Sequence, residues 1–468
     1  MTGISEREHY RVLPMRCLIL SVSTLILSAT IPALPAAELK RNAQIVEVAT
    51  HISPKQIETN IRKLVGFGTR HTLSATTSET RGIGAARRWL QEEFERYADQ
   101  SGGRLQVSLD QFTQPPGERN PQPVQVVNVV ATLPGEQPES RDRIYVVTGH
   151  YDSRVTDVMN STADAPGADD DASGVAAVLE MARVMSKYKW DATLVFMAVA
   201  GEEQGLFGST HWAKMAKQKN WNVAGMITND MIGNSHAEDG RVDNNHVRLF
   251  AEGVPPLKEM PEEWLKQIKT GGENDSSPRE LARFIKTTAE RYVDGMTVNM
   301  IYRKDRYLRG GDHVPFLVEG YPAVRLTEPN EDFRHQHQDL RKVNGVQYGD
   351  LPEFVDFNYL AQVARVNAVS LGALALAPAA PGQVTVEAKE LTNDTTLAWQ
   401  ANKEPDLAGY EILWRDTTAP LWQHSISVGK VTRATVPKVS KDNFLFGIAA
   451  VDKEGNRSPA VYPAPSMK

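Results

Sequence analysis

The sequence predicts an α/β domain with a mostly parallel central sheet flanked by helices, followed by a small all-β sandwich. Two observations carry this prediction. Between residues 53 and 376, apolar runs that contain β-branched residues alternate with segments of helical periodicity, and buried apolar strands interleaved with helices are typical of parallel sheets. After residue 382 the pattern changes to short alternating runs separated by turn residues, which is typical of a β-sandwich.

Each element of the first domain has a local reason. Ser53 and Ser173 stand where a side-chain oxygen can cap the first turn of a helix. Five segments repeat their apolar residues with the spacing of one helix face: 53–64, 80–97, 173–185, 206–215 and 355–376. Five shorter apolar runs predict strands: 124–133, 144–148, 192–200, 223–227 and 323–326.

Two segments interrupt this alternation. Residues 234–310 form an insert in which the periodicity weakens and the charge rises, with one clear helix at 277–292. A long excursion of this kind forms a wall or lid of a pocket, or is peripheral decoration. Residues 377–382, Ala-Pro-Ala-Ala-Pro-Gly, predict a linker between a first domain at 38–376 and a C-terminal module at 383–468.

Composition excludes several classes of protein. The chain has 468 residues, with 52 Lys and Arg against 58 Asp and Glu, and a net charge of −6. Because there is no polybasic tract, neither nucleic acid nor an anionic membrane surface is expected as a partner. Cys17 is the only cysteine, which excludes internal disulfides and a thiolate zinc cluster. Any metal site must therefore consist of His, Asp and Glu.

The N-terminus predicts export. Arg11 and Arg16 precede an apolar run at 17–31, which is followed by prolines and small residues. This order is typical of a secretory signal peptide, and the run is shorter than the roughly 20 residues of a membrane span. We expect cleavage that removes residues 1–37 and leaves a bacterial periplasmic or extracellular protein without a membrane span. An uncleaved amphipathic or anchoring segment is the alternative.

Acidic and imidazole side chains follow four of the predicted strands: His150 with Asp152, the triplet 169–171, Glu202 with Glu203, and Asp230. In a parallel sheet the carboxyl ends of the strands meet at one edge, where ligands bind. Adjacent carboxylates repel one another unless cations or N–H groups balance their charge. Taken singly, each group also has an explanation without metal, as a hydrogen-bonded loop pair, an acidic helix cap or a charged helix start. Together they favour a metal site.

The residue types suit a zinc site with a general base. A neutral imidazole such as His150 can bind zinc, and a carboxylate two positions away, Asp152, can accept its other N–H. Of two adjacent carboxylates, one can bind metal while the other acts as general base towards a metal-bound water. Residues 332–339, after another predicted strand, supply two further imidazoles, His335 and His337. This set suffices for two zinc ions that share a bridging carboxylate.

In combination these loops resemble peptidase family M28, the co-catalytic zinc aminopeptidases of the bacterial leucyl type, over about residues 53–376. The motifs that carry the resemblance are His-x-Asp-Ser, Pro-Gly-Ala-Asp-Asp-Asp-Ala-Ser-Gly, Gly-Glu-Glu-x-Gly, Asn-Asp-Met-Ile-Gly and His-x-x-x-Asp, in that order. The resemblance implies the phosphorylase/hydrolase-like fold of zinc exopeptidases, two zinc ions per chain, and peptides as substrates that lose their N-terminal residue.

The resemblance also implies a role for each residue. The expected ligands are His150 and Asp230 for the first zinc, Asp170 as the bridge, and Glu203 and His335 for the second. His335 is selected over His337 because the family's last histidine precedes an aspartate by four positions, as His335 precedes Asp339. Glu202 is expected as general base and acid for a zinc-bridging hydroxide, and Asp152 as the residue that orients His150.

Three other functions share this scaffold. A carboxypeptidase would use the same two-zinc site, because the direction of exopeptidase cleavage depends on the pocket walls. A glutaminyl cyclase uses one zinc and departs from the aspartate triplet, which is intact here. A non-catalytic binding protein would be expected to lose ligands or base, and all six positions are present.

The C-terminal module resembles a fibronectin type III domain. The resemblance rests on residues 397–399, 405–410, 446–452 and 455–459, and Phe446 stands where that family has a tyrosine. The module carries no catalytic constellation. We expect it to bind a cell envelope or substrate, or to stabilise the first domain.

Overall fold

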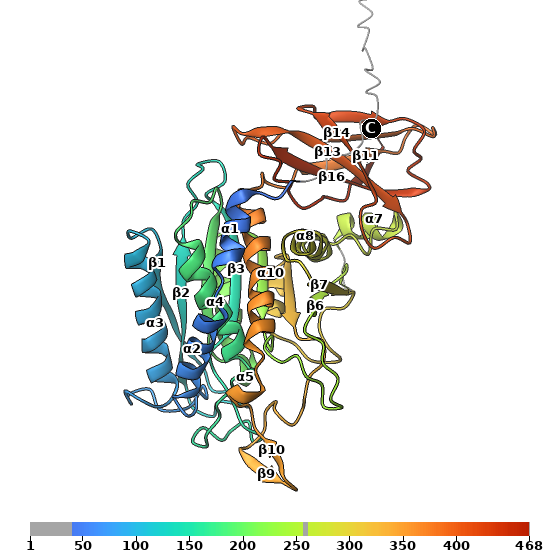
Figure 1. Cartoon of the computed structure of the whole chain (residues 1–468). Helices are drawn as coiled ribbons and strands as arrows, with labels where there is room; N and C mark the ends of the chain where they lie inside the picture. The colour runs from blue at the N-terminus through green and yellow to red at the C-terminus, as the bar shows by residue number, and fades with distance from the viewer. Residues whose placement is uncertain (1–39, 256–260, 468) are drawn as a thin grey trace, which may run out of the picture. The chain divides into compact units, whose positions relative to one another are not determined.

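The computed structural model describes residues 40–255 and 261–467, and Figure 1 shows how their helices and strands are arranged. The expected signal peptide, residues 1–37, lies outside the described residues. The described chain contains one large mixed sheet with helices on both faces and two small C-terminal sheets. The expectation of an α/β domain followed by a small β-structure is confirmed.

The large sheet has eight strands. In spatial order they are β1 (Gln106–Gln114), β2 (Val124–Leu133), β4 (Thr193–Val199), β3 (Arg143–His150), β5 (Asn222–Asn229), β8 (Ala323–Thr327), β6 (His246–Ala251) and β7 (Thr297–Ile301). Strands β4, β3, β5 and β8 are parallel neighbours, as expected for buried apolar strands. On one side of this parallel group, β2 pairs antiparallel with β4, and the edge strand β1 pairs antiparallel with β2. On the other side, β6 pairs antiparallel with β8.

Helices cover both faces of this sheet, because successive side chains of each strand point to opposite faces. On β3, Val147 packs in a cluster with six helices, whereas its neighbour Val146 packs with two others. The first set is α1 (Ala43–His51), α2 (Pro54–Val65), α3 (Ile83–Gln100), α4 (Ala172–Met185), α8 (Ser277–Tyr292) and α10 (Phe357–Leu376). The second set is α6 (Phe207–Gln218) and α9 (His313–Val318).

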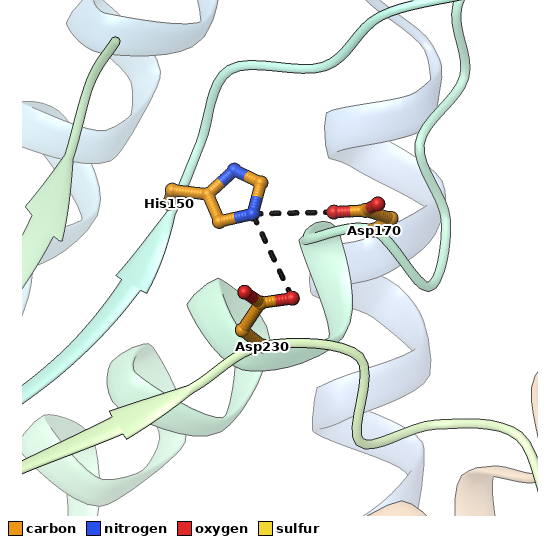
Figure 2. A group of neighbouring side chains, drawn as sticks. All are labelled: His150, Asp170 and Asp230. Carbon is orange, nitrogen blue, oxygen red and sulfur yellow. Dashed lines mark ion pairs between the residues drawn. The ribbon is translucent and has the colours of Figure 1, made fainter. Parts of the chain in front are cut away.

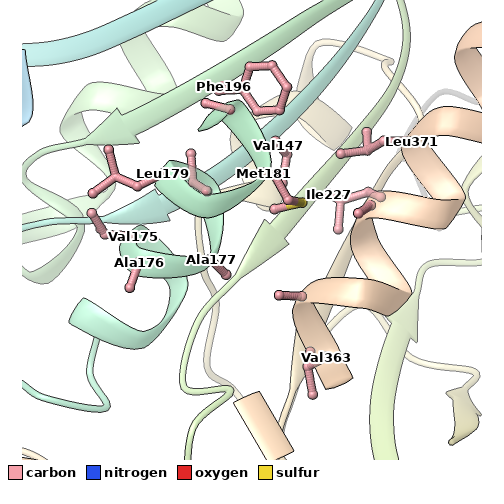
Figure 3. Packing of buried hydrophobic residues seen from close by; sticks show 14 of the residues in the cluster. Val147, Val175, Ala176, Ala177, Leu179, Met181, Phe196, Ile227, Val363 and Leu371 are labelled. Atoms are coloured by element: carbon pink, nitrogen blue, oxygen red, sulfur yellow. The ribbon is translucent and has the colours of Figure 1, made fainter. Parts of the chain in front are cut away.

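The main core lies between the sheet and helices α4 and α10. Figure 3 shows Val147, Phe196 and Ile227 of the strands against Met181 of α4 and Leu371 of α10. Among the described residues, α10 alone is long and apolar enough to cross a membrane, but 83% of its apolar window is buried inside the protein. Helix α10 is therefore a central helix of the core, where it packs with α4 and the sheet in one apolar cluster.

The segment at 234–310 differs from the expected insert. It contains the predicted helix α8, but also β6 and β7, which extend the sheet beyond β8. These two strands are therefore part of the central sheet, while a role of the remaining segment as a pocket wall or lid stays a prediction. The short β6 and β7 were not predicted because their apolar runs are interrupted by charged and polar residues such as Arg248 and Asn299. The remaining short elements are α5 (Glu202–Gly205), α7 (Glu262–Lys269), the 3-10 turn at Pro352–Phe354, and the hairpin of β9 (Arg341–Val343) and β10 (Val346–Tyr348).

The C-terminal part folds into two sheets around its own apolar cluster. One sheet has the order β15 (Arg433–Val436), β12 (Thr395–Gln400), β11 (Gly382–Glu387) and β17 (Ala464–Ser466), and the other has β14 (His424–Gly429), β13 (Leu407–Asp416) and β16 (Phe444–Asp452). Trp399, Tyr410 and Phe446 belong to the cluster between the sheets. The resemblance to a fibronectin type III domain stays a prediction.

Buried ion pairs join this sandwich to the first domain. Arg415 on β13 donates to both carboxylate oxygens of Asp275, at 2.7 and 2.9 Å, and Arg283 of α8 donates to Asp275 at 3.0 Å. Trp422 donates to Glu280 at 3.1 Å. Since Asp275 and both arginines are almost completely buried, the sandwich shares a common interior with α8.

Candidate metal centre

The predicted site residues lie at one edge of the central sheet. His150 is the last residue of β3, Asp230 follows the last residue of β5, and Glu202 with Glu203 opens the short helix that follows β4. Gly201 makes the turn from β4 to α5 with a φ of 77°, a conformation that favours glycine. The carboxyl ends of the strands thus deliver ligand-type side chains to one place, as the alternating sequence pattern predicts.

Two groups of three side chains share Asp170. In the first, the Nε2 atom of His150 lies 3.2 Å from Oδ1 of Asp170 and 4.0 Å from Oδ1 of Asp230, as Figure 2 shows. In the second, Nε2 of His337 lies 2.9 Å from Oδ2 of Asp170 and 3.0 Å from Oε1 of Glu203. The donor atoms within each group lie within 4.8 Å of one another. The two oxygens of Asp170 therefore face one group each.

The structure corrects the expected last ligand. His335 does not reach Asp170 or Glu203; its ring stacks on Phe354 with centroids 3.5 Å apart, and its Nδ1 lies 3.6 Å from Asp332. His337, two positions later, takes the place beside Asp170. The spacing to the following aspartate selected the wrong histidine because the backbone between them is not regular: His337 itself has a φ of 53°. An irregular loop does not preserve the direction of side chains at a fixed spacing.

Two buried aspartates next to the ligand-type residues hold the backbone. Asp171 accepts hydrogen bonds from the backbone N–H groups of His150 at 2.9 Å and Gly174 at 2.9 Å. Asp350, which sequence reasoning missed, accepts the N–H of residue 169 at 2.8 Å and that of Asp170 at 2.7 Å. These contacts fix the loop that carries Asp170, and no local motif around Asp350 signals this role.

Asp152 contacts more than the imidazole it was expected to orient. Its carboxylate lies 3.7 Å from Nδ1 of His150, whose nearer partner is the backbone carbonyl of Asp152 itself at 3.2 Å. The same carboxylate accepts the N–H groups of Glu202 at 3.3 Å and Glu203 at 3.1 Å, and the hydroxyl of Thr72 at 2.9 Å. Asp152 therefore ties the end of β3 to the start of α5.

Comparison with known proteins decides the family. A model of peptidase family M28 matches residues 128–351. A probable zinc metalloprotease of Leptosphaeria maculans is 51% identical over 432 residues, which cover 92% of this chain and 98% of the relative. A probable zinc metalloprotease of Pyrenophora teres f. teres is 50% identical and covers 90% of this chain and 87% of the relative. The chain belongs to peptidase family M28.

Solved structures agree with the M28 fold. LapB and LapA of Legionella pneumophila each superpose with a TM-score of 0.50, at 19% and 20% identity. The superposition with LapB covers 73% of this chain and 78% of the LapB chain, and the superposition with LapA covers 72% of this chain and 78% of the LapA chain. At this identity the likeness concerns the fold alone. The curated relatives named above are fungal, so they give the expectation of a bacterial protein no support.

Several ionisable groups of the M28 site lie close together and shift one another's pKa. Burial raises the pKa of Glu202 well above its usual range, and the nearby carboxylates Asp230 and Glu203 raise it further. Burial also opposes the ionisation of Asp170, yet the adjacent His337 and His150 hold its pKa well below the usual range. Asp170 is thus an anion between two imidazoles, surrounded by further carboxyl groups that repel one another unless cations are bound.

The residues present fit zinc. Within the described part of the chain, the buried Nε2 of His150 and Oε1 of Glu203 make no hydrogen bond with acceptable geometry. Buried polar atoms are rarely left in that state, and an imidazole nitrogen and a carboxylate oxygen are the ligands that zinc takes in the absence of cysteine. The M28 chain is therefore a zinc metallopeptidase whose own side chains supply the donors for the metal.

An arginine next to the site was also missed. Arg325 lies on β8, is completely buried, and places Nη2 3.0 Å from Oδ1 of Asp230 and Nη1 3.2 Å from Asp305. The signal was present in the sequence, since an arginine in the middle of an apolar strand requires a buried anionic partner. Arg325 positions the carboxylate of Asp230.

Proposed function

We propose that this M28 peptidase is a two-zinc aminopeptidase that removes the N-terminal residue of peptides. One observation carries the proposal: two groups of three donor side chains share Asp170, one carboxylate oxygen facing each group. His150 and Asp230 would hold one ion, Glu203 and His337 the other, with Asp170 between them.

The chemistry divides between metal and protein. When bound, the zinc ions polarise the scissile carbonyl and make water acidic enough to be deprotonated near neutral pH. Glu202 lines the same cleft as Asp170, Glu203 and Asp230. Its side chain is the remaining carboxylate of the adjacent pair, so it can accept the proton of the attacking water and return it to the leaving amine.

Asp152 serves this step through the backbone. By accepting the N–H groups of Glu202 and Glu203, it sets where α5 begins and therefore where the general base and its neighbouring ligand point. General acid–base catalysis requires such positioning, because the proton must travel over hydrogen-bonding distance.

The aminopeptidase direction rests on the resemblance of the motifs. A carboxypeptidase is the second candidate, and one observation favours it: four arginines line the cleft beside the ligand-type residues, and a C-terminal carboxylate needs a cationic partner. A panel of amino-acid p-nitroanilides and of peptides with a free C-terminus, each with a free and an N-acetylated N-terminus and with and without a chelator, tests the proposal. Cleavage that is lost with the chelator and on N-acetylation supports an aminopeptidase, whereas cleavage only of peptides with a free C-terminus supports the second candidate.

We also propose that the protein is exported. The basic flank and the apolar run at 17–31 support this. Expression of the full chain with a C-terminal tag, followed by N-terminal sequencing of the secreted protein, tests it. A mature N-terminus near residue 38 is expected, and retention of the intact chain inside the cell would contradict it.

A further inference from the structure

Four arginines from three separate loops line the cleft that contains the ligand-type residues. The cleft has a volume of about 330 Å³. Arg119 comes from the loop between β1 and β2, Arg154 from the segment after β3, and Arg306 and Arg309 from the loop between β7 and α9. No motif of the sequence predicted this convergence.

Arg306 and Arg309 share one carboxylate. Both donate to Oε2 of Glu331, at 3.1 and 2.9 Å, while Arg248 donates to its other oxygen at 3.0 Å. Arg306 also contacts Asp305, which is itself paired with Arg325. Glu331 is almost completely buried and holds the three guanidinium groups in place. Its single negative charge cannot balance their three positive charges.

Arg154 and Arg119 bond mainly to backbone oxygens. Arg154 donates to the carbonyl oxygens of Val155 and Thr156, and Arg119 donates to the carbonyl of Glu203 at 3.0 Å. The nearest carboxylate to Arg154 is Glu203, at 4.0 Å, and Arg119 has no carboxylate partner within the described residues. If Glu203 holds a metal ion, neither arginine has an anion left to pair with.

The charge balance of the cleft follows from its lining. Four carboxylates, Asp170, Glu202, Glu203 and Asp230, line the cleft together with the four arginines. Two divalent zinc ions would match the charges of these four carboxylates, and among the described residues the further carboxylates against Arg306 and Arg309 are those of Glu331 and Asp305. The zinc-loaded cleft is therefore positive, and a partly enclosed site of one sign attracts the opposite charge.

We propose that the cleft binds a carboxylate of the peptide substrate next to the scissile bond, with Arg154 and Arg119 as its partners. This inference rests on the proposed peptidase function and gives it a substrate class. The carboxylate has two possible sources: the side chain of a terminal Glu or Asp, or the α-carboxylate of a short peptide. Guanidinium groups suit either source, because they donate two parallel hydrogen bonds to a carboxylate.

Binding to the zinc-loaded Glu202→Gln protein tests the proposal independently of turnover. Calorimetry compares Glu-Ala-Ala-amide with Gln-Ala-Ala-amide for the side-chain source, and Gln-Ala with Gln-Ala-amide for the α-carboxylate source. We expect the charged member of one pair to bind at least about tenfold more tightly, as charge-assisted hydrogen bonds do. Adding Arg119→Gln and Arg154→Gln should abolish that preference, and the pair that shows it identifies the source.

Arg303→Gln is the matched control. Arg303 is an exposed arginine of the β7–α9 loop that stacks on Tyr307 and does not line the cleft, so its removal should leave the preference intact. Arg119 and Arg154 are chosen over Arg306 and Arg309 because their loss leaves no buried carboxylate unpaired. If the double variant loses zinc or its thermal stability, the exposed Arg119→Gln alone is measured.

Two results would overturn the proposal: equal affinities within both pairs, or a preference that the double variant keeps. Failure of the proposed function has a different signature. In that case the wild-type protein hydrolyses no peptide or p-nitroanilide, while the binding preference and its dependence on the arginines remain.

Discussion

His337 lies with its Nε2 atom 2.9 Å from the carboxylate of Asp170. Asp170 lies in the loop before α4, whereas His337 lies in the loop after β8. Their contact brings His337 into the second group of donors, with Asp170 and Glu203. This contact is the reason why we propose His337, and not His335, as the last zinc ligand.

Replacing His337 therefore separates the two candidate histidines. His337→Ala should lose about one of the two proposed zinc ions and nearly all peptidase activity. The second group of donors would then keep only two side chains, Asp170 and Glu203. His335→Ala should keep both ions, since His335 stacks on Phe354 away from the cluster. Zinc content by plasma mass spectrometry after dialysis distinguishes them. Equal zinc content in the two variants would contradict the assignment.

Replacing Glu202 should affect turnover and not metal. Glu202→Gln removes the proposed proton acceptor but none of the six donor atoms, so kcat should fall by about 10²–10⁴-fold with unchanged zinc content. Single-turnover assays with a p-nitroanilide measure the change. A variant that retained the wild-type kcat would exclude Glu202 as the base. A variant that lost zinc would indicate that Glu202 is a zinc ligand.

The interface between sandwich and peptidase domain should contribute strongly to stability. Asp275→Ala leaves Arg283 and Arg415 buried without their shared carboxylate, and breaking a buried ion pair costs about 3–5 kcal/mol. Chemical denaturation of the zinc-loaded protein measures the loss. Asp294→Ala is the control, because Asp294 is 81% exposed in its pair with Arg41 and such exposed ion pairs contribute little to the free energy of unfolding. Similar effects of the two substitutions would argue against a common interior.

His313 should make the protein less stable in acid. Burial lowers the pKa of His313 from 6.5 to about 4, so between these values the unfolded chain binds the proton and the folded chain does not. Its contribution is therefore present above pH 6.5 and is lost as the pH falls towards 4. Between pH 7.5 and pH 5 this amounts to about 2 kcal/mol of unfolding free energy.

The His313→Gln variant isolates this contribution from other acid-sensitive groups. Glutamine can still donate to the carbonyl of Lys304, the partner of Nε2 at 2.8 Å, but does not titrate. Denaturation curves of wild type and variant at both pH values give the difference of differences. An equal loss of stability in the two proteins would show that His313 titrates at its ordinary pKa in the folded state.

Particular residues show how far the sequence determines this structure. The strands β2, β3, β4, β5 and β8 were predictable because each is a run of apolar residues buried on both faces. The edge strand β1 has the largely polar sequence Gln-Val-Ser-Leu-Asp-Gln-Phe-Thr-Gln, whose apolar residues do not alternate strictly, so that it carries no comparable signal. Its pairing with β2 depends on a surface that only the folded sheet provides.

The site divides in the same way. His150, Glu203 and Asp230 follow regular strands, so their convergence follows from the sheet. His337 and Asp350 lie in irregular loops, where a spacing in sequence does not determine a direction in space. Asp170 was predictable from the charge of its triplet, but the contacts that hold it come from Asp350, 180 residues further along the chain.

Asp171 has a consequence for how the protein acquires its metal. Its carboxylate accepts backbone N–H groups from His150, at the end of β3, and from Met231, beside Asp230, at 2.9 and 3.3 Å. The separation between these two ligand positions is therefore determined when the sheet and α4 come together. We therefore expect metal uptake to remove little conformational freedom, so that the entropy of assembling ligands should reduce the affinity only slightly. On this view the metal enters a site that is already formed, unlike that of a zinc finger, whose chain folds only around the metal.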